Sequence, residues 1–310
     1  MNASILRIGT RGSRLALAQA KGIRRLLRTK FPWLRTRLVI IKTAGDEFQS
    51  VELFKKNNIG VFTKALEEKL LKCEIDLAVH SLKDLPTELP QGLMIAAFPK
   101  RLDPSDALIS KGRFSIVDLP LGATVGTGSP RRKSQIHMLR PDLELHDMRG
   151  NLDTRVRRVI VEKKYDAIIV AHAGLLRLKK YLGYARLIPA DKLLPAVGQA
   201  ALGLEIRTND KEAFNIVRKL NHSGTEKTVT TERKFLEVLQ GGCRVPVGVY
   251  CSIRSGKIHL KAAVFSIKTK AILRGEISRP VNQYRKVGAI LARRLLKLGA
   301  EKFLKEARDV

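Results

Sequence analysis

Cysteine is scarce in this chain of 310 residues, and its pattern excludes two common uses of the thiol. Cys73, Cys243 and Cys251 are odd in number, and no two of them have the C-x-x-C spacing. Neither a disulfide framework nor a zinc knot is expected, and a reducing compartment, the cytoplasm, fits best. We expect Cys73 and Cys251 to be packing residues. The scattered histidines show no metal-ligand spacing, so no metal site is predicted.

Long apolar runs are also missing. No run reaches the roughly 18–20 residues that span a bilayer, so no membrane segment is expected. The P-loop pattern is absent, which disfavours a nucleoside triphosphate as ligand, and no G-x-S-x-G elbow of a serine hydrolase occurs. Hydrophobic residues make up 44% of the chain and charged residues 28%, as in a globular protein.

Acidic residues are few: 29 stand against 59 lysines and arginines, which gives a net charge of +30. Such an excess attracts nucleic acid, an anionic membrane or a small polyanion. Aromatic residues make up only 5%, few for a protein that stacks bases, and the basic residues are spread over the whole length. Nucleic acid is therefore not an expected partner, although the charge keeps it as an alternative.

Strand and helix patterns alternate over the first 200 residues. A strand at 5–10, a helix at 12–31 and a strand at 36–42 open the chain. This alternation predicts an α/β fold with two parallel-rich sheets covered by helices. Further elements are expected as a helix at 62–72, strands at 75–80, 92–98 and 106–110, and strand–turn–helix units within 122–140 and 143–178.

After about residue 215 the pattern changes to that of a smaller α+β domain. A helix at 225–240 precedes strands at 247–254, 257–267 and 269–277 and an amphipathic helix at 281–298. We expect three domains: α/β domain 1 at 1–99, completed by 200–216; α/β domain 2 at 100–199; and α+β domain 3 at 217–310.

Cationic side chains occur where the predicted strands end. Ligands of open α/β sheets bind at the carboxyl ends of the strands, and glycine-rich turns at helix starts expose N–H groups to anions. The sequence therefore predicts a site for a molecule with several carboxylates or phosphates. Its candidate residues are Arg11, Ser13, Ser81, Lys83, Thr127, Ser129, Arg131, Arg132, Arg149 and Arg155.

Asp84 and Cys243 each have a structural and a chemical interpretation. Asp84 is either a turn residue paired with Lys83 or a carboxylate that stabilises a developing cation and moves protons. Cys243, in "LQGGCRVPVG" at 239–248, is either a small filler or a thiol presented on pliable backbone beside Arg244. The residues alone leave both questions open.

Eight segments, taken in order, resemble the porphobilinogen deaminase family. They are RIGTRGSRLALAQ, AVHSLKDLP, DPSDAL, GTGSPRR, MRGNLDTR, AHAGLLRL, LPAVGQ and GGCRVPVG. The resemblance runs from about residue 5 to the end of the chain. It implies a monomer with two periplasmic-binding-protein-like α/β domains and a hinge, whose crossovers lie near Pro99 and 194–199. The third domain would present Cys243.

The resemblance also implies a transferase of haem and tetrapyrrole biosynthesis. Four porphobilinogen molecules would be deaminated and joined to a dipyrromethane cofactor, held by Cys243 through a thioether, before hydrolysis releases hydroxymethylbilane. Asp84 matches the catalytic aspartate. The cofactor-binding positions would be Lys83, Ser129, Arg131, Arg132, Thr127, Ser13 and Ser81, and the substrate-binding positions Arg11, Arg149, Arg155, Arg177 and Phe62.

The chain departs from the family pattern in two places. Residues 57–60 read NNIG where the family has GGKG, so the lysine expected of an active-site lid is Ile59. Ala200 stands where the family has the glycine of VGQG. Two alternatives to the deaminase are a solute-binding protein that holds a dicarboxylate and a nucleic-acid-binding protein. A pure binder needs neither a tethering thiol nor a carboxylate among arginines.

Overall fold

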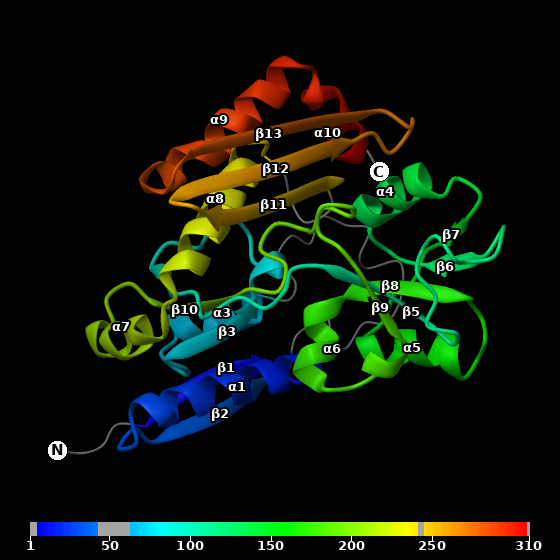
Figure 1. The fold of residues 1–310 in the computed structure, drawn as a ribbon. Helices are drawn as coiled ribbons and strands as arrows, with labels where there is room; N and C mark the ends of the chain where they lie inside the picture. Colours follow the sequence, from blue (N-terminus) through cyan, green and yellow to red (C-terminus); the bar gives the residue numbers. More distant parts are fainter. Residues whose placement is uncertain (1–4, 43–62, 241–244, 309–310) are drawn as a thin grey trace. The chain divides into compact units, whose positions relative to one another are not determined.

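A computed structural model describes residues 5–42, 63–240 and 245–308, and its contacts divide the chain into two compact units. The first unit holds residues 1–101 and 201–226, and the second holds residues 102–200 and 227–310. Figure 1 shows the sheets and helices from which the units are built. The three-domain boundaries expected from the sequence stay a prediction.

The first unit is built on a five-stranded sheet in the order β2-β1-β3-β10-β4. β1 (Leu6–Arg11) pairs in parallel with β2 (Thr36–Ile41) and with β3 (Leu77–Ser81). β10 (Leu202–Arg207) runs antiparallel both to β3 and to β4 (Leu93–Ala97). A strand from after residue 200 thus pairs with strands from the first hundred residues.

Helix α1 (Arg14–Lys30) packs on this sheet because its apolar residues follow the helical period. Its buried residues include Ala20, Ile23 and Leu27, which join the core of the unit with Ile8 of β1. Further helical segments among the described residues of this unit include α3 (Lys64–Leu71), α7 (Lys211–Val217) and the short turns η1 (Leu82–Asp84) and η3 (Arg218–Leu220).

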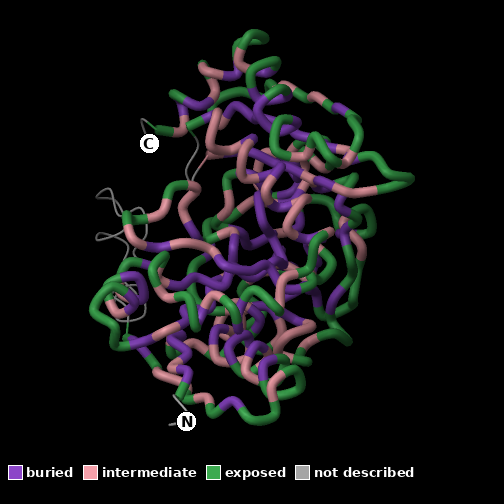
Figure 2. The backbone as a smooth tube through the Cα atoms, turned by 90° about the vertical axis from the view of Figure 1, so that its left-hand side faces the viewer, coloured by how far each residue is buried: buried purple, intermediate pink, exposed green. Residues whose placement is uncertain are grey.

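The second unit has a five-stranded sheet in the order β7-β6-β8-β5-β9. β6 (Thr124–Gly126) pairs in parallel with β7 (Glu144–His146) and with β8 (Ala167–Ala171). β5 (Asp106–Ser110) runs antiparallel to β8 and to the edge strand β9 (Ala185–Ile188). β5 and β8 are almost wholly buried, as their apolar sequences require, and Figure 2 shows such buried backbone in purple.

Helices connect the strands of this sheet. α4 (Pro130–Leu139) links β6 to β7, and α5 (Leu152–Ile160) links β7 to β8. α6 (His172–Leu178) follows β8 directly, and the turn η2 (Leu182–Tyr184) precedes β9. The β6–α4, β7–α5 and β8–α6 steps correspond to the strand–turn–helix units predicted within 122–140 and 143–178.

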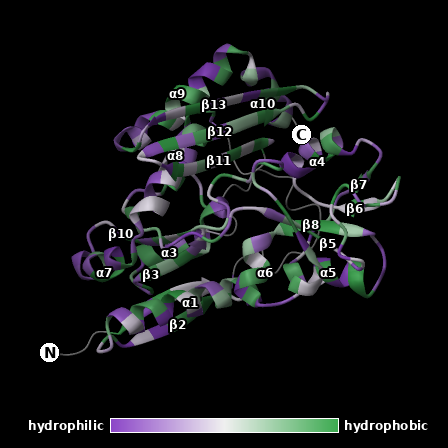
Figure 3. Cartoon of the chain, in the orientation of Figure 1, coloured by the Kyte–Doolittle hydropathy of each residue, from purple (hydrophilic) through white to green (hydrophobic). Residues whose placement is uncertain are grey.

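The second unit also contains an antiparallel sheet of β11 (Val247–Arg254), β12 (Lys257–Phe265) and β13 (Ile272–Pro280). Helix α9 (Tyr284–Lys297), which follows the turn η4 (Val281–Gln283), packs its apolar face on this sheet, and its mixed hydropathy is visible in Figure 3. The core there is completed by α8 (Ser223–Val238) and α10 (Ala300–Arg308).

The fold class expected from the sequence is confirmed, although four of the described strands and α-helices were not predicted. These are β9, β10, α7 and α10. β10 reads LGLEIR, in which a glycine and a fully buried glutamate interrupt the apolar pattern of a central strand. Such a strand is recognised only through the neighbours that pair with it.

Candidate active site

Five of the expected site residues lie at one edge of the first unit's sheet. β1 ends at Arg11 and β3 ends at Ser81, and these strands are adjacent and parallel, so their carboxyl ends share an edge. Ser13 caps α1, because its side chain accepts a hydrogen bond from the first turn of the helix. The turn η1 follows β3 at once and carries Lys83 and Asp84.

Apolar side chains anchor the turn that carries Asp84. Leu82 and Leu85 are only 1% and 3% exposed. Gln19 of α1 donates from Nε2 to Ser81 Oγ at 2.8 Å, and Ser81 Oγ donates to Gln19 Oε1 at 3.3 Å. Asp84 itself is exposed, so a firmly held turn presents its carboxylate to solvent.

A buried acid–imidazole pair joins the end of β3, just before this turn, to the neighbouring strand β10. His80 Nε2 and Glu205 Oε2 lie 2.8 Å apart, and the side chains are 3% and 0% exposed. Burial raises the pKa of nearby Glu67, an effect that a hydrogen bond to Thr63 opposes. The sequence analysis assigned no role to His80 or to either glutamate. The available signal was a glutamate inside the apolar strand LGLEIR.

The expected residues of the second unit begin in the turn between β6 and α4. Thr127 is buried, and its Oγ1 accepts a hydrogen bond from the backbone N–H of Ser129 at 3.4 Å. Ser129 caps α4. Gly128 is required by close approach, because a Cβ at this position would lie 2.7 Å from the carbonyl oxygen of Met148. This turn lies at the carboxyl edge of β6.

Arg131 and Arg132 are already paired with a carboxylate that the sequence analysis did not assign to the site. Arg131 Nη2 donates to Asp106 Oδ2 at 2.8 Å, and Arg132 Nη2 donates to Asp106 Oδ1 at 2.7 Å. Burial raises the pKa of Asp106, but the two guanidinium groups outweigh it and hold this pKa well below the ordinary value. The two arginines of α4 are therefore held by a carboxylate of their own unit.

The remaining arginines differ in exposure. Arg149 is exposed in the turn before α5, and Arg155 donates from Nε to the carbonyl oxygen of Gly150 at 2.8 Å. Arg177 donates from Nη2 to the carbonyl oxygen of Ala200 at 2.6 Å. Burial lowers the pKa of Arg177 to about 10, so the guanidinium stays charged at neutral pH. A carboxylate bound beside it would offset that cost of burial.

Cys243, Phe62 and the segment 57–60 lie outside the described residues. Within the described ranges, no group of three or more His, Cys, Asp or Glu residues is placed to hold a metal ion. Among the helices described here, none is both long and apolar enough to cross a bilayer. Cys251 is buried in β11 as expected, whereas the prediction of a packed Cys73 is wrong, because that residue is exposed.

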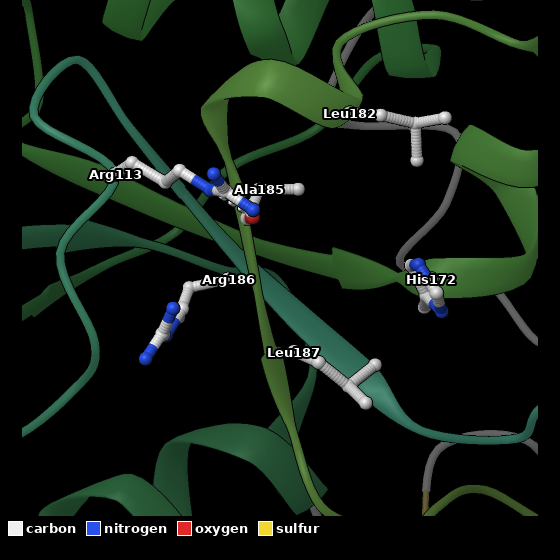
Figure 4. Close-up of a pocket in the computed structure, with 6 residues that line it drawn as sticks. All are labelled: Arg113, His172, Leu182, Ala185, Arg186 and Leu187. Atoms are coloured by element: carbon white, nitrogen blue, oxygen red, sulfur yellow. Dashed lines mark hydrogen bonds between the residues drawn. The ribbon is translucent and has the colours of Figure 1, made fainter.

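A pocket of about 380 Å³ lies beside β9, and the sequence analysis did not predict it (Figure 4). Arg113 donates from Nε to the carbonyl oxygen of Ala185 at 3.3 Å near one end of the pocket, and His172 lies at the other. The lining mixes cations with leucines and indicates no single class of ligand. It consists of Arg113, His172, Leu182, Ala185, Arg186 and Leu187.

Two solved structures illustrate a distant resemblance to this chain. The periplasmic VFT2 domain of Bordetella pertussis BvgS is 13% identical, with a TM-score of 0.41 over 74% of this chain and 92% of that one. The reduced form of OxyR from N. meningitidis is 14% identical, with a TM-score of 0.42 over 70% of this chain and 93% of that one. Similarity at this level says nothing of function.

Curated sequences resemble the chain closely and over nearly its full length. The porphobilinogen deaminase of Chlorobaculum tepidum is 46% identical over 304 residues, which cover 97% of each chain. That of Chlorobium limicola is 46% identical over 305 residues, again 97% of each. That of Syntrophobacter fumaroxidans is 42% identical over 309 residues, 99% of each.

Two family models match the chain in succession. The model described as "Porphobilinogen deaminase, dipyromethane cofactor binding domain" matches residues 6–215. The model described as "Porphobilinogen deaminase, C-terminal domain" matches residues 226–297. Together they cover most of the sequence, and the relatives agree with them over its whole length, so this chain belongs to the porphobilinogen deaminase family.

Proposed function

We propose that this chain is an active hydroxymethylbilane synthase, a transferase of haem and tetrapyrrole biosynthesis. It deaminates four porphobilinogen molecules, joins them head-to-tail on a dipyrromethane primer and releases hydroxymethylbilane and ammonia. The observation that carries the proposal is the buried arginine pair of α4 in a chain whose family binds dipyrromethane. Pyrrole acetates and propionates are the carboxylates that such arginines would hold.

The residues of the second unit fit a carboxylate-bearing cofactor. The Nε atoms of Arg131 and Arg132 are buried and have no hydrogen-bond partner among the described residues. Buried donors in native proteins are normally satisfied, so a ligand oxygen at this position would complete the arrangement. The half-buried hydroxyl of Ser129 and the desolvated Arg177 add further donors.

The proposed anchor of the cofactor is Cys243, through a thioether. When bound, the dipyrromethane supplies the free pyrrole end to which the first substrate is joined. We assign cofactor binding to Lys83, Ser129, Arg131, Arg132, Thr127, Ser13 and Ser81. We assign binding of the substrate's carboxylates and ring to Arg11, Arg149, Arg155, Arg177 and Phe62.

Asp84 is the proposed catalytic residue. Loss of ammonia from porphobilinogen leaves positive charge on the pyrrole ring, and a carboxylate that accepts a hydrogen bond from the ring N–H stabilises that charge. The same carboxylate can hold a proton during deamination and coupling. Its exposure on an anchored turn suits this task, since the acid is held in place yet open to a ligand.

Replacing Asp84 tests this assignment. We expect Asp84→Ala to lower the turnover of porphobilinogen by at least about 10²-fold, the range of general acid–base catalysis, without unfolding the protein. Glu88→Gln, an exposed acid on the same connection, is the matched control and should keep wild-type turnover. A rate near that of the wild type for Asp84→Ala would remove Asp84 from the mechanism.

We also propose a monomer in the cytoplasm that binds neither nucleic acid nor membranes. Family resemblance supports the monomer, and the small, odd number of cysteines without C-x-x-C spacing supports the reducing compartment. The proposed domains remain 1–99 with 200–216, 100–199 and 217–310. Light scattering tests the monomeric state. Titration with duplex and single-stranded DNA at physiological ionic strength tests the statement that the protein binds no nucleic acid. A dimer mass, or tight binding with a steep salt dependence, would contradict these statements.

A further inference from the structure

Asp106 is the hub of a buried hydrogen-bond network in the second unit. As the first residue of β5, it has no exposed surface. Its Oδ2 accepts from Arg131 at 2.8 Å, and its Oδ1 accepts from Arg132 at 2.7 Å and from Gln199 Nε2 at 2.9 Å. One carboxylate thereby fixes two neighbouring guanidinium groups of α4.

Backbone carbonyls fix the same two guanidinium groups from a second direction. Arg131 Nη1 donates to the carbonyl oxygen of Leu194 at 2.6 Å, and Arg132 Nη1 donates to that of Ile169 at 3.0 Å. Both terminal nitrogens of each arginine are thus held by the protein. Each Nε is left without a partner among the described residues, so the remaining donors of both groups are oriented in advance.

The charges of this triad do not balance. Two guanidinium groups and one carboxylate, 2 − 1, leave one positive charge on side chains that are 5%, 7% and 0% exposed. A buried uncompensated charge and unused donors are both costly, and a purely structural ion pair would carry neither. One further carboxylate would neutralise the charge and accept from the unused Nε donors.

We propose that Asp106 is a positioning residue that turns Arg131 and Arg132 toward their ligand and limits the pair to a single ligand carboxylate. The inference rests on the proposed function, because that carboxylate belongs to the dipyrromethane. Asp106 supplies the first negative charge of the site, and the cofactor supplies the second.

Two substitutions at Asp106 and one control test the inference. Asp106→Asn keeps the shape but removes the charge, and Asp106→Glu keeps the charge but displaces it. Asp147→Asn is the control, because Asp147 also pairs with α4, through Lys133 at 3.0 Å, but its side chain is 78% exposed. All proteins are produced without porphobilinogen, and uptake of the covalent adduct is then followed by intact mass after porphobilinogen is added.

We expect Asp106→Asn to take up the adduct at least tenfold more slowly than the wild type. Asp106→Glu should reach full uptake at a rate between those two, and Asp147→Asn should match the wild type. An Asp106→Asn protein that folds and is loaded at the wild-type rate would overturn the inference. If Asp106→Asn does not fold, Asp106→Glu decides, since loading at the wild-type rate in that variant contradicts a positioning role.

Binding of a small carboxylate is the second readout. It should increase in Asp106→Asn while adduct uptake decreases, whereas a general loss of structure would lower both. Without the Asp106 carboxylate the pair carries two positive charges, so small anions should bind it more tightly. Sodium propionate, compared with sodium chloride at equal ionic strength, should raise the melting temperature of unloaded Asp106→Asn at least twice as much as that of the wild type. An equal or smaller rise contradicts the charge argument.

Adduct uptake and the propionate comparison together distinguish a failure of the inference from a failure of the proposed function. A wild-type protein that takes up no adduct refutes the proposed function, while the propionate comparison still decides the role of Asp106. Normal loading of the wild type with equal loading of both Asp106 variants refutes the inference alone.

Discussion

Ala200 lies in the left-handed region of backbone conformation, with φ of 69°, where the family pattern has glycine. A Cβ in this region costs roughly 1–2 kcal/mol, whereas glycine costs less than that in lost chain entropy. We therefore expect Ala200→Gly to raise the free energy of unfolding by up to about 1 kcal/mol.

Ala201 provides the control for that change. It is buried and is not among the described residues with positive φ, so Ala201→Gly should destabilise the protein by about 1 kcal/mol. Urea denaturation of both variants measures the difference. Destabilisation by both substitutions would show that the left-handed backbone at Ala200 stores no strain.

Acid should weaken the network at Asp106. The pKa of this carboxyl is lower in the folded chain than in the unfolded chain, where aspartate titrates near 3.9. Its stabilisation is therefore complete above that value and is lost as the pH falls below it toward the lowered pKa. The gap in unfolding free energy between the wild type and Asp106→Asn should stay constant from about pH 7 to 5 and shrink below about pH 4.

Urea denaturation across this pH range, with Asp147→Asn as the exposed control, measures the gap. A gap that widens in acid would mean that the Asp106 carboxyl binds its proton more readily in the folded chain. That result would contradict the ion pairs described for it.

The positions of site residues were predictable from the sequence where a short local motif determines them. Ser13 and Ser129 cap helices, and Lys83 and Asp84 lie together on one turn, as their motifs indicate. The pairing of Arg131 with Asp106 was not predictable, because the two residues lie 25 positions apart, on α4 and on β5. They come into contact only in the folded sheet, where β5 runs antiparallel beside β8.

Elements with their own periodic pattern were also predictable. β5 and β11 have the predicted bounds, and α1 (Arg14–Lys30) lies within the predicted helix at 12–31. β10 was missed because Gly203 and Glu205 interrupt the continuous apolar run of a central strand, and its place between β3 and β4 is set only on folding. A strand of this kind is visible only in the folded chain.

The close contact between helices α8 and α9 leads to a prediction about Gly288. A Cβ on Gly288 would lie 2.2 Å from the carbonyl oxygen of Thr231 and 2.7 Å from the backbone nitrogen of Phe235. We expect Gly288→Ala to separate these helices and to cost roughly 1–3 kcal/mol of stability, as overpacking does.

Gly22 is the matched position, because it also lies within a helix, α1, but no atom lies within 4 Å of its built Cβ. Gly22→Ala should stabilise the protein by roughly 0.5–1 kcal/mol through helix propensity. Thermal unfolding compares the two variants. Tolerance of alanine at Gly288 would contradict the close approach of α8 and α9.

At the scale of the whole molecule, the net charge of +30 far exceeds what a few pyrrole carboxylates need. Many of these cations lie on outer faces, such as the exposed side of α1, whose first turn has no acidic residue. The charge would draw an anionic substrate toward the protein, and such steering weakens as salt is added. We expect kcat/KM for porphobilinogen to fall as ionic strength rises, with kcat less affected. Equal sensitivity of both would contradict steering.

The central claim is that Cys243 carries a dipyrromethane, and the most direct measurement is the intact mass of the purified chain followed by peptide mapping. We predict a mass excess of one dipyrromethane, located on the peptide that contains Cys243 and absent from Cys243→Ser. A wild-type chain that stays unmodified after incubation with porphobilinogen, or an adduct on another residue, would contradict the account.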